Sequence, residues 1–360
     1  MLNFLNNKLS LNLKYNSAIL SKCLWIVLLA LAWQGDCNSQ ELFSWTKETP
    51  YCNPSVVGLP RAKALILKYE LQPDYRIKST GKLGNYGSSQ GQVNQNRRLD
   101  FRLRFPIINK PSLTIAAGIK YTHEEFRFEN TPGNNYDLYK DLEDRPLKSL
   151  GLHFYVVKPT RTKKYFILRA SFDLNGDYTS DKIGKMNFLK FSISPLIGWK
   201  QNENLSYAVG VSYGYTFGVP LVIPVLSINK NFNCHFGIES LLPVNLRLRY
   251  TPNAKNYLYA GLELAGSSYR LESEGTAFNA YDKLHLFRSE LRATINFERE
   301  IYDWIWFGIE AGYRNNIFFN LTNGSRSKSD IIIDNHLKAA PLFNASLFAV
   351  PPRGLLKKRK

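Results

Sequence analysis

Ser212 comes closer to a catalytic pattern than any other residue in this chain. Gly210, Ser212 and Gly214 match the Gly-x-Ser-x-Gly motif of serine hydrolases, which needs a sharp turn from a strand into a helix to expose the serine. Here the motif lies inside the alternating segment Leu205–Phe217, and no helical pattern follows it. Glycines in a strand more commonly relieve crowding or permit bending. We therefore expect no enzyme, and a lipid-modifying enzyme that uses Ser212 is our third hypothesis.

The other candidates for chemistry are scattered histidines and one acidic segment. The five histidines lie on separate segments and form no motif, which is more typical of wall or rim residues than of general bases. Asp173–Asp177 has the Asp and Gly residues of a calcium loop, but the sixth position lacks Gly and the twelfth lacks Glu. The sequence therefore predicts no catalytic residue, no cofactor and no metal site.

Alternation of apolar and polar residues dominates the chain after Val57. In the segment Arg97–Phe105, apolar and charged residues alternate strictly from Arg98 onward. Successive side chains of a strand point to opposite faces, so one face of this segment is apolar and the other is charged. Segments of this kind, such as Leu113–Tyr121 and Phe166–Asp173, recur about fourteen times. The series predicts an all-β fold.

Connections between these segments tend to alternate between long and short. The long ones are rich in Gly, Asn, Ser and Asp and lie at Lys82–Asn96, Glu129–Arg145, Leu174–Asn187, Glu272–Asp282 and Leu321–Asn335. Long loops on one rim and short turns on the other are typical of an outer-membrane barrel. The sequence predicts a transmembrane up-and-down antiparallel β-barrel of about 12–14 strands, with the short-turn rim and both termini in the periplasm.

Two stretches leave the number of strands open. Prolines lack the N–H donor that a closed barrel needs, so bulges or an in-folded segment are expected among Pro195, Pro220, Pro224 and Pro243, and twelve strands result if two are lost. The apolar residues of Leu284–Phe297 also fit a helical stripe. We expect a strand there, because alternating segments flank it on both sides.

The regions outside the barrel have a different character. Leu24–Trp33 is an apolar run of signal-peptide length that follows several lysines, so residues 1–39 are expected to be a signal peptide, with lipoprotein cleavage at Cys37 as the alternative. Residues 40–60 are expected to form a leader that plugs the barrel or lies in the periplasm. The barrel itself is expected over residues 61–348, followed by a basic tail over residues 349–360.

Removal of the signal peptide leaves two cysteines, Cys52 and Cys234. In an oxidising compartment these two thiols can pair, and the bridge would tether the leader to the barrel wall. Two unrelated thiols are the alternative, and the sequence does not decide between them.

The charged faces of the strands are expected to point into the lumen. These faces carry Glu70, Asp100, Arg102, Arg104, Glu124, Arg169, Asp173, Arg247, Arg249, Glu263, Arg288, Glu290, Arg292, Glu310 and Arg314. Because both signs are present, an ion-pair network that fills the interior is the favoured interpretation. Arginine is the commonest of these residues, so any unpaired guanidinium groups would favour anionic solutes.

The formal net charge of +18 arises from 47 basic and 29 acidic residues. The export signal argues against nucleic acid as a partner, and so does the interleaving of the charges with strands. Phosphate-bearing lipid head groups, including lipopolysaccharide, and small anionic solutes are the expected partners. The oligomeric state is not indicated.

Three segments carry a resemblance to a known family. Val57–Glu70, Pro220–Pro224 and Leu246–Tyr250 resemble a family of outer-membrane barrels of unknown function from Gram-negative bacteria. The resemblance covers most of the mature chain and implies the fold and the location, but no substrate and no catalytic residues. The chain departs from the general pattern at its end, where Leu337–Phe348 is followed by a tail instead of stopping at an aromatic residue.

Two further functional hypotheses follow from the predicted barrel. The leading one is a narrow channel or transporter for small polar or anionic solutes, since a barrel of about 12–14 strands leaves a narrow or plugged passage. The alternative is a closed structural or adhesive barrel that binds partners through its long loops, especially Glu129–Arg145 and Leu321–Asn335.

Overall fold

The computed structural model describes residues 54–129, 136–161, 163–179, 188–324 and 328–354. The predicted signal peptide, leader residues 40–53 and tail residues 355–360 lie outside this part. Fifteen strands form one sheet. Their bounds are β1 Leu65–Gly81, β2 Ser88–Lys110, β3 Leu113–Phe128, β4 Leu147–Arg161, β5 Lys164–Gly176, β6 Leu189–Asn202, β7 Leu205–Gly214, β8 Leu221–Asn231, β9 Phe236–Leu242, β10 Asn245–Asn253, β11 Asn256–Arg270, β12 Leu284–Tyr302, β13 Ile305–Asn323, β14 Ile331–Leu337 and β15 Ala340–Ala349.

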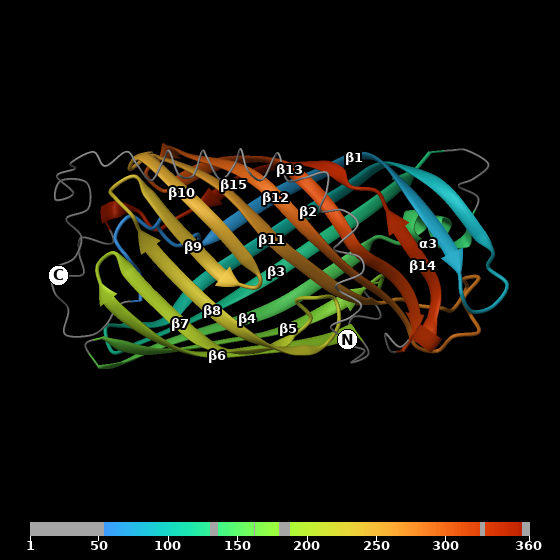
Figure 1. Ribbon diagram of the computed structural model, residues 1–360, viewed down its shortest axis with the longest axis horizontal. Coiled ribbons are helices and arrows are strands. Elements are labelled where there is room, and N and C mark those ends of the chain that lie inside the picture. The colour runs from blue at the N-terminus through green and yellow to red at the C-terminus, as the bar shows by residue number, and fades with distance from the viewer. Residues whose placement is uncertain (1–53, 130–135, 162, 180–187, 325–327, 355–360) are drawn as a thin grey trace, which may run out of the picture.

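The sheet closes on itself as an antiparallel barrel (Figure 1). β14 and β15 are two halves of one wall strand, because both keep the same register against β1, through Ile77↔Leu337 and Leu71↔Phe343. The barrel therefore has fourteen wall strands, at the upper end of the predicted range. The strand predicted over Leu284–Phe297 is confirmed and belongs to β12.

A belt of exposed apolar side chains surrounds the wall. Leu67, Leu152, Ile197 and Ile309, for example, are 45–53% exposed and lie on four different strands. Large apolar side chains exposed over so many strands are typical of a wall in contact with lipid, so the barrel spans a membrane through its strands. Among the described residues, no helix is long and apolar enough to cross a membrane.

The prolines do not remove any strand from the barrel wall. Pro195 lies in β6 where the pairing with β7 lapses, between Ile193↔Tyr213 and Leu196↔Gly210. Pro224 lies in β8 beyond its pairs with β9, which begin at Leu226. Pro243 lies in the turn between β9 and β10. A missing N–H is tolerated where the ladder is already interrupted.

Three of the predicted loops contain regular structure. Residues 88–96 belong to β2, because their polar side chains do not prevent the backbone from pairing with β1. The connection between β3 and β4 contains the helix α3, Asp137–Asp144. β14 begins inside the loop predicted over Leu321–Asn335, and the short helix η4, Lys328–Asp330, precedes it. The long-loop rim therefore carries shorter loops than expected.

At the long-loop end of the barrel, strands from opposite parts of the wall approach one another. β9 and β10 are short and are joined there by only two residues, Pro243 and Val244. β11 also pairs in parallel with β5, at Arg270 and Gly176, although five strands separate them in the sheet order. In Figure 1 this end lies at the right, where α3 is drawn among the strands.

Candidate functional site in the barrel interior

Charged side chains from distant strands meet across the barrel interior. Arg292 on β12 donates to both carboxylate oxygens of Glu70 on β1, at 2.9 and 3.1 Å. Arg288 on β12 donates to Glu124 on β3, at 2.7 Å. Two wall strands separate the first pair and four separate the second, so these contacts can run only through the interior.

Glu290 and Arg314 join the two ion pairs, and we call the six charged residues together the buried layer. Glu290 accepts a hydrogen bond from Nε of Arg292 at 2.7 Å and lies 3.6 Å from Arg314, which stacks over the ring of Tyr75. The six charged residues of the layer are at most 6% exposed. Buried charges need partners, and each of these has one. The layer links β12 and β13 to β1 and β3 across the interior.

An apolar core closes the interior between this layer and the long-loop end. Wall strands supply inward apolar residues, such as Ile77, Phe126 and Leu286, and α3 adds Leu138, Tyr139 and Leu142. Tyr139 stacks on Phe128 with ring centroids 4.8 Å apart, and its hydroxyl lies 2.7 Å from that of Ser79. The apolar face of α3 is thus buried inside the barrel, where the sequence predicted only a loop.

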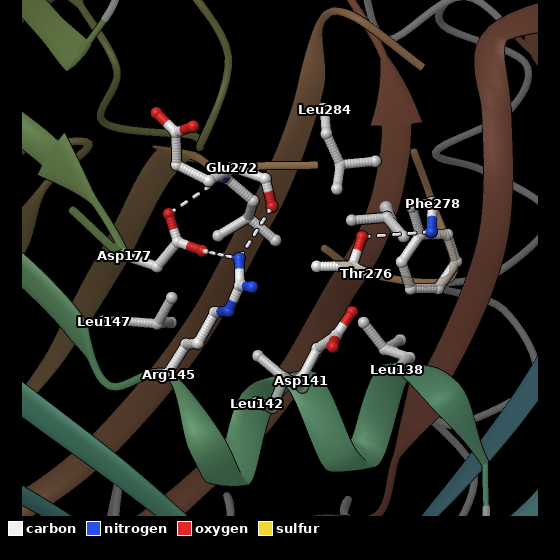
Figure 2. A pocket seen from close by; sticks show the side chains of 12 residues that line it. Leu138, Asp141, Leu142, Arg145, Leu147, Asp177, Glu272, Thr276, Phe278 and Leu284 are labelled. Atoms are coloured by element: carbon white, nitrogen blue, oxygen red, sulfur yellow. Dashed lines mark hydrogen bonds and ion pairs between the residues drawn. The ribbon is translucent and has the colours of Figure 1, made fainter. Parts of the chain in front are cut away.

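A small pocket remains between α3 and the connection from β11 to β12 (Figure 2). Its polar edge is formed by Arg145, Asp177 and Glu272. Arg145 lies 3.9 Å from Asp177 and donates to the carbonyl of Glu272 at 3.2 Å, and Asp177 accepts the N–H of Glu272 at 3.0 Å. Burial raises the pKa of Asp177 to about 6. The pocket volume of about 10 Å³ is close to what one water needs, so it holds no solute.

Unpaired arginines lie nearer the short-turn rim. Arg104 on β2 and Arg169 on β5 are exposed and form no ion pair with any residue that the structure describes. Arg104 interacts electrostatically with Arg102 and with Arg169, across two intervening strands, so the three side chains share the interior. Arg102 itself donates to Asp100 at 2.7 Å. Guanidinium groups that face water without a carboxylate attract anions.

The residues expected in the lumen differ in burial. Most of the paired ones are buried: Glu70, Asp100, Glu124, Arg249, Arg288, Glu290, Arg292 and Arg314. Arg102, Asp173 and Glu310 are half-buried, whereas Arg104, Arg169, Arg247 and Glu263 are exposed. The favoured ion-pair network is present among the buried ones. That the exposed ones line a path for solutes stays a prediction.

The sequence analysis did not identify several ion-pair partners of these residues. Lys68 lies 3.1 Å from Glu310. His153 lies 3.3 Å from Asp173, and Glu239 lies 3.1 Å from Arg249. Each missed partner lies among the inward-facing residues of its strand, so counting alternate positions along every strand would have found it.

Ser212 has a serine as its neighbour. Its hydroxyl lies 2.7 Å from that of Ser194 on β6, and β7 ends two residues later without a helix. Among the described residues, no group of three or more His, Cys, Asp or Glu could hold a metal ion.

The described part of the leader crosses the short-turn mouth of the barrel. Val57 donates its N–H to Glu203 in the β6–β7 turn at 2.9 Å and accepts from Asn231 at 2.5 Å. Four residues later, Arg61 donates to the carbonyl of Asp303 in the β12–β13 turn at 2.5 Å. Four residues reach at most about 14 Å, so this segment, residues 54–63, takes a direct route across the mouth. We call it the strap.

Cys234 lies in the β8–β9 turn and is disulfide-bonded. The other three cysteines, Cys52 among them, lie outside the described residues. The pairing of Cys52 with Cys234 therefore stays a prediction.

Comparisons with known proteins give one matching family model and several solved structures of low similarity. A family model described as a domain of unknown function matches residues 65–338. An outer membrane channel from Pseudomonas putida F1 is 11% identical with a TM-score of 0.36, over 84% of this chain and 99% of that chain. A FadL homologue from Pseudomonas aeruginosa is 10% identical with a TM-score of 0.32, over 80% and 90%. The translocator domain of the autotransporter NalP from Neisseria meningitidis is 12% identical with a TM-score of 0.33, over 80% and 88%.

No curated protein matches the chain. At such low identities and TM-scores, the structural likenesses carry no argument about this chain.

Proposed function

The chain belongs to the family "Domain of unknown function (DUF6268)", and from this premise we propose that it is a gated outer-membrane conduit for small anionic solutes. The observation that carries the proposal is the group of Arg102, Arg104 and Arg169 inside the barrel, two of which have no acidic partner among the described residues. Side chains that only filled the interior would be paired, as those of the buried layer are. Unpaired arginines open to water suit a path for anions.

The state that the structure describes is a closed one under this proposal. Anions enter from the short-turn mouth and reach Arg104 and Arg169, which lie nearer that mouth than the buried ion pairs do. The apolar core and α3 then block the long-loop end. Opening requires α3 to leave the interior, and its burial rests on three side chains, Leu138, Tyr139 and Leu142.

Solute flux into liposomes tests the proposal. We expect the purified full chain to admit gluconate faster than N-methylglucamine, an organic cation of similar size. Arg104→Gln together with Arg169→Gln should remove this preference. The control is Lys158→Gln together with Lys164→Gln, two exposed residues near the short-turn rim. Equal flux of the two solutes through the unaltered protein would contradict the proposal.

A closed structural barrel that binds partners through its loops is the second candidate. It is favoured by the apolar core, which fills the long-loop end with the described side chains. Under this alternative, flux stays at the level of lipid alone even when α3 is forced out of the interior, and only the removal of loops changes binding.

The orientation in the membrane is also part of the proposal. The short-turn rim and both termini face the periplasm, as in other barrels with this arrangement of loops. A membrane-impermeant maleimide applied to intact cells should label Glu274→Cys on the long-loop rim and not Ala254→Cys on the short-turn rim. The reverse labelling would contradict this orientation.

A further inference from the structure

Basic residues gather on the outer surface of the wall near the long-loop end. Arg76 and Lys78 on β1, Arg127 on β3 and Lys338 between β14 and β15 are exposed, and Arg97 on β2 is half-buried. We call these five residues the basic patch.

The backbone places the residues of the basic patch on the outer face. Their neighbours Tyr75, Ile77, Phe126, Phe128 and Leu337 are buried in the apolar core inside the barrel. Because successive side chains of a strand point to opposite faces, the residues between them point outward.

The strand pairing brings the patch together over four adjacent strands. The N–H of Lys338 donates to the carbonyl of Arg76 at 2.9 Å. Arg127 lies opposite Gln95, which is two residues from Arg97. β14, β1, β2 and β3 are consecutive in the sheet, so the patch is continuous along the wall.

The patch lies directly at the edge of the apolar belt. On the same outer face, the wall toward the short-turn rim carries Tyr69 and Leu99, which are 44% and 38% exposed. The change from apolar to basic side chains marks the level where hydrocarbon gives way to lipid head groups.

The basic patch is a local feature of the wall. On the other side of the barrel, the outward residues near the same ends of β5, β7 and β8 are apolar, namely Phe172, Tyr213 and Val222. A general requirement for cations at this rim would have placed them on these strands too.

The cations of the patch are available for a ligand. Arg76, Lys78, Arg127 and Lys338 form no ion pair with any residue of the described ranges. Four acidic residues, Asp74, Glu125, Glu129 and Asp334, share this face, and Glu125 lies 3.0 Å from His123. The five basic residues outnumber them.

We propose that the basic patch binds the phosphate groups of lipopolysaccharide in the outer leaflet. Arg and Lys form charge-assisted hydrogen bonds with phosphate oxygens, and the three arginines and two lysines of the patch offer donors over a wide area. The acyl chains of the same lipid would lie on Tyr69 and Leu99. The proposal needs the long-loop rim to face the outer leaflet, and it does not depend on conduction.

Binding of purified lipid A to the full chain in nanodiscs tests the proposal. The patch variant carries Arg76→Gln, Lys78→Gln, Arg127→Gln and Lys338→Gln. The control variant removes the same charge near the short-turn rim, through Lys110→Gln, Lys158→Gln, Lys164→Gln and Lys255→Gln. We expect the patch variant to bind bisphosphorylated lipid A at least about tenfold more weakly, and the control variant to bind it like the unaltered protein.

Lipid A from which both phosphates have been removed provides the second arm, and vesicles of phosphatidylglycerol provide the third. Weak binding of both by the unaltered protein would support the proposal. Unchanged affinity of the patch variant would overturn it, and so would equally tight binding of dephosphorylated lipid A or of phosphatidylglycerol. Heat-modified migration in gels verifies that each variant is folded. If the fourfold variant does not fold, Lys78→Gln with Lys338→Gln is measured instead, with an expected loss of about threefold or more.

Discussion

Arg292 has a central place in the buried layer of charges, because it bonds to both Glu70 and Glu290. Replacing it by Met leaves Glu70 without its ion-pair partner inside the barrel and leaves Glu290 with Arg314 alone, at 3.6 Å. We expect Arg292→Met to lower the free energy of unfolding by about 3–5 kcal/mol, as for other broken buried pairs. Urea unfolding of the protein in lipid vesicles measures the change. Arg104→Met is the control and should cost less than about 1 kcal/mol, because Arg104 is exposed and unpaired. Equal losses would show that the layer has no special role.

Asp177 gives the long-loop end a dependence on pH. Burial raises its pKa from 3.8 to about 6, so the folded state favours the protonated carboxyl. Its stabilising contribution is therefore complete below about pH 4 and is lost as the pH rises through about 6. Arg145 and Glu272 are the charged groups beside it. Hydrogen exchange of the amides over residues 271–283, corrected for intrinsic rates, should show less protection at pH 7 than at pH 5. Asp177→Asn should abolish the difference, and a difference that persists would rule out Asp177 as its source.

Helix α3 is the element on which the proposed gating depends. Leu138→Asp with Leu142→Asp places two carboxylates in the apolar core, where a buried charge is costly, so the helix should leave the interior. In planar bilayers we expect the mean conductance to rise several-fold. Lys140→Asp changes the exposed side of the same helix and should leave conductance unaltered. Unaltered conductance in the double variant would indicate that α3 is not the closing element.

The strap is the second element with a testable attachment. Because Cys234 is disulfide-bonded, we expect peptide mapping without reduction to join the segments that contain Cys52 and Cys234. Cys234→Ser should then lower stability by about 2–4 kcal/mol, since the bridge closes a long loop of the chain. Cys52→Ser should have the same effect. Alkylation of Cys52 in the unreduced protein would contradict the pairing.

Alternation along the strands predicts the wall of this barrel but not what fills it. In β1, Glu70 and Gln72 are buried, whereas after Asp74, which has a φ of 20°, the buried residues are Tyr75, Ile77 and Ser79. Inward positions thus change from even to odd numbers at this irregularity. The rule that charged residues face inward holds on one side of Asp74 and fails on the other, where Arg76 and Lys78 face outward. Alternation gives the two faces of a strand, and only packing decides which face is interior.

Taken as a whole, the molecule combines a lipid-facing wall with an interior of two kinds. Buried, paired charges and an apolar core stabilise one part of the interior, and the exposed Arg104 and Arg169 lie nearer the short-turn rim. The sequence predicted the wall and the paired charges, because both follow from residue type and strand period. The buried α3 was missed, since its short apolar face lies in a polar loop and has a partner only in the folded barrel.

The sign of the reversal potential in a salt gradient tests the proposed conduit most directly. In planar bilayers with potassium chloride more concentrated on one side, we expect the Leu138→Asp and Leu142→Asp variant to select anions. Adding Arg104→Glu and Arg169→Glu should reverse the sign and make the same channel select cations. A reversal potential that shows no selectivity, or selectivity for cations, before these arginines are changed would contradict an arginine-lined path for anions. So would a reversal potential whose sign stays the same after the two arginines are replaced by glutamate.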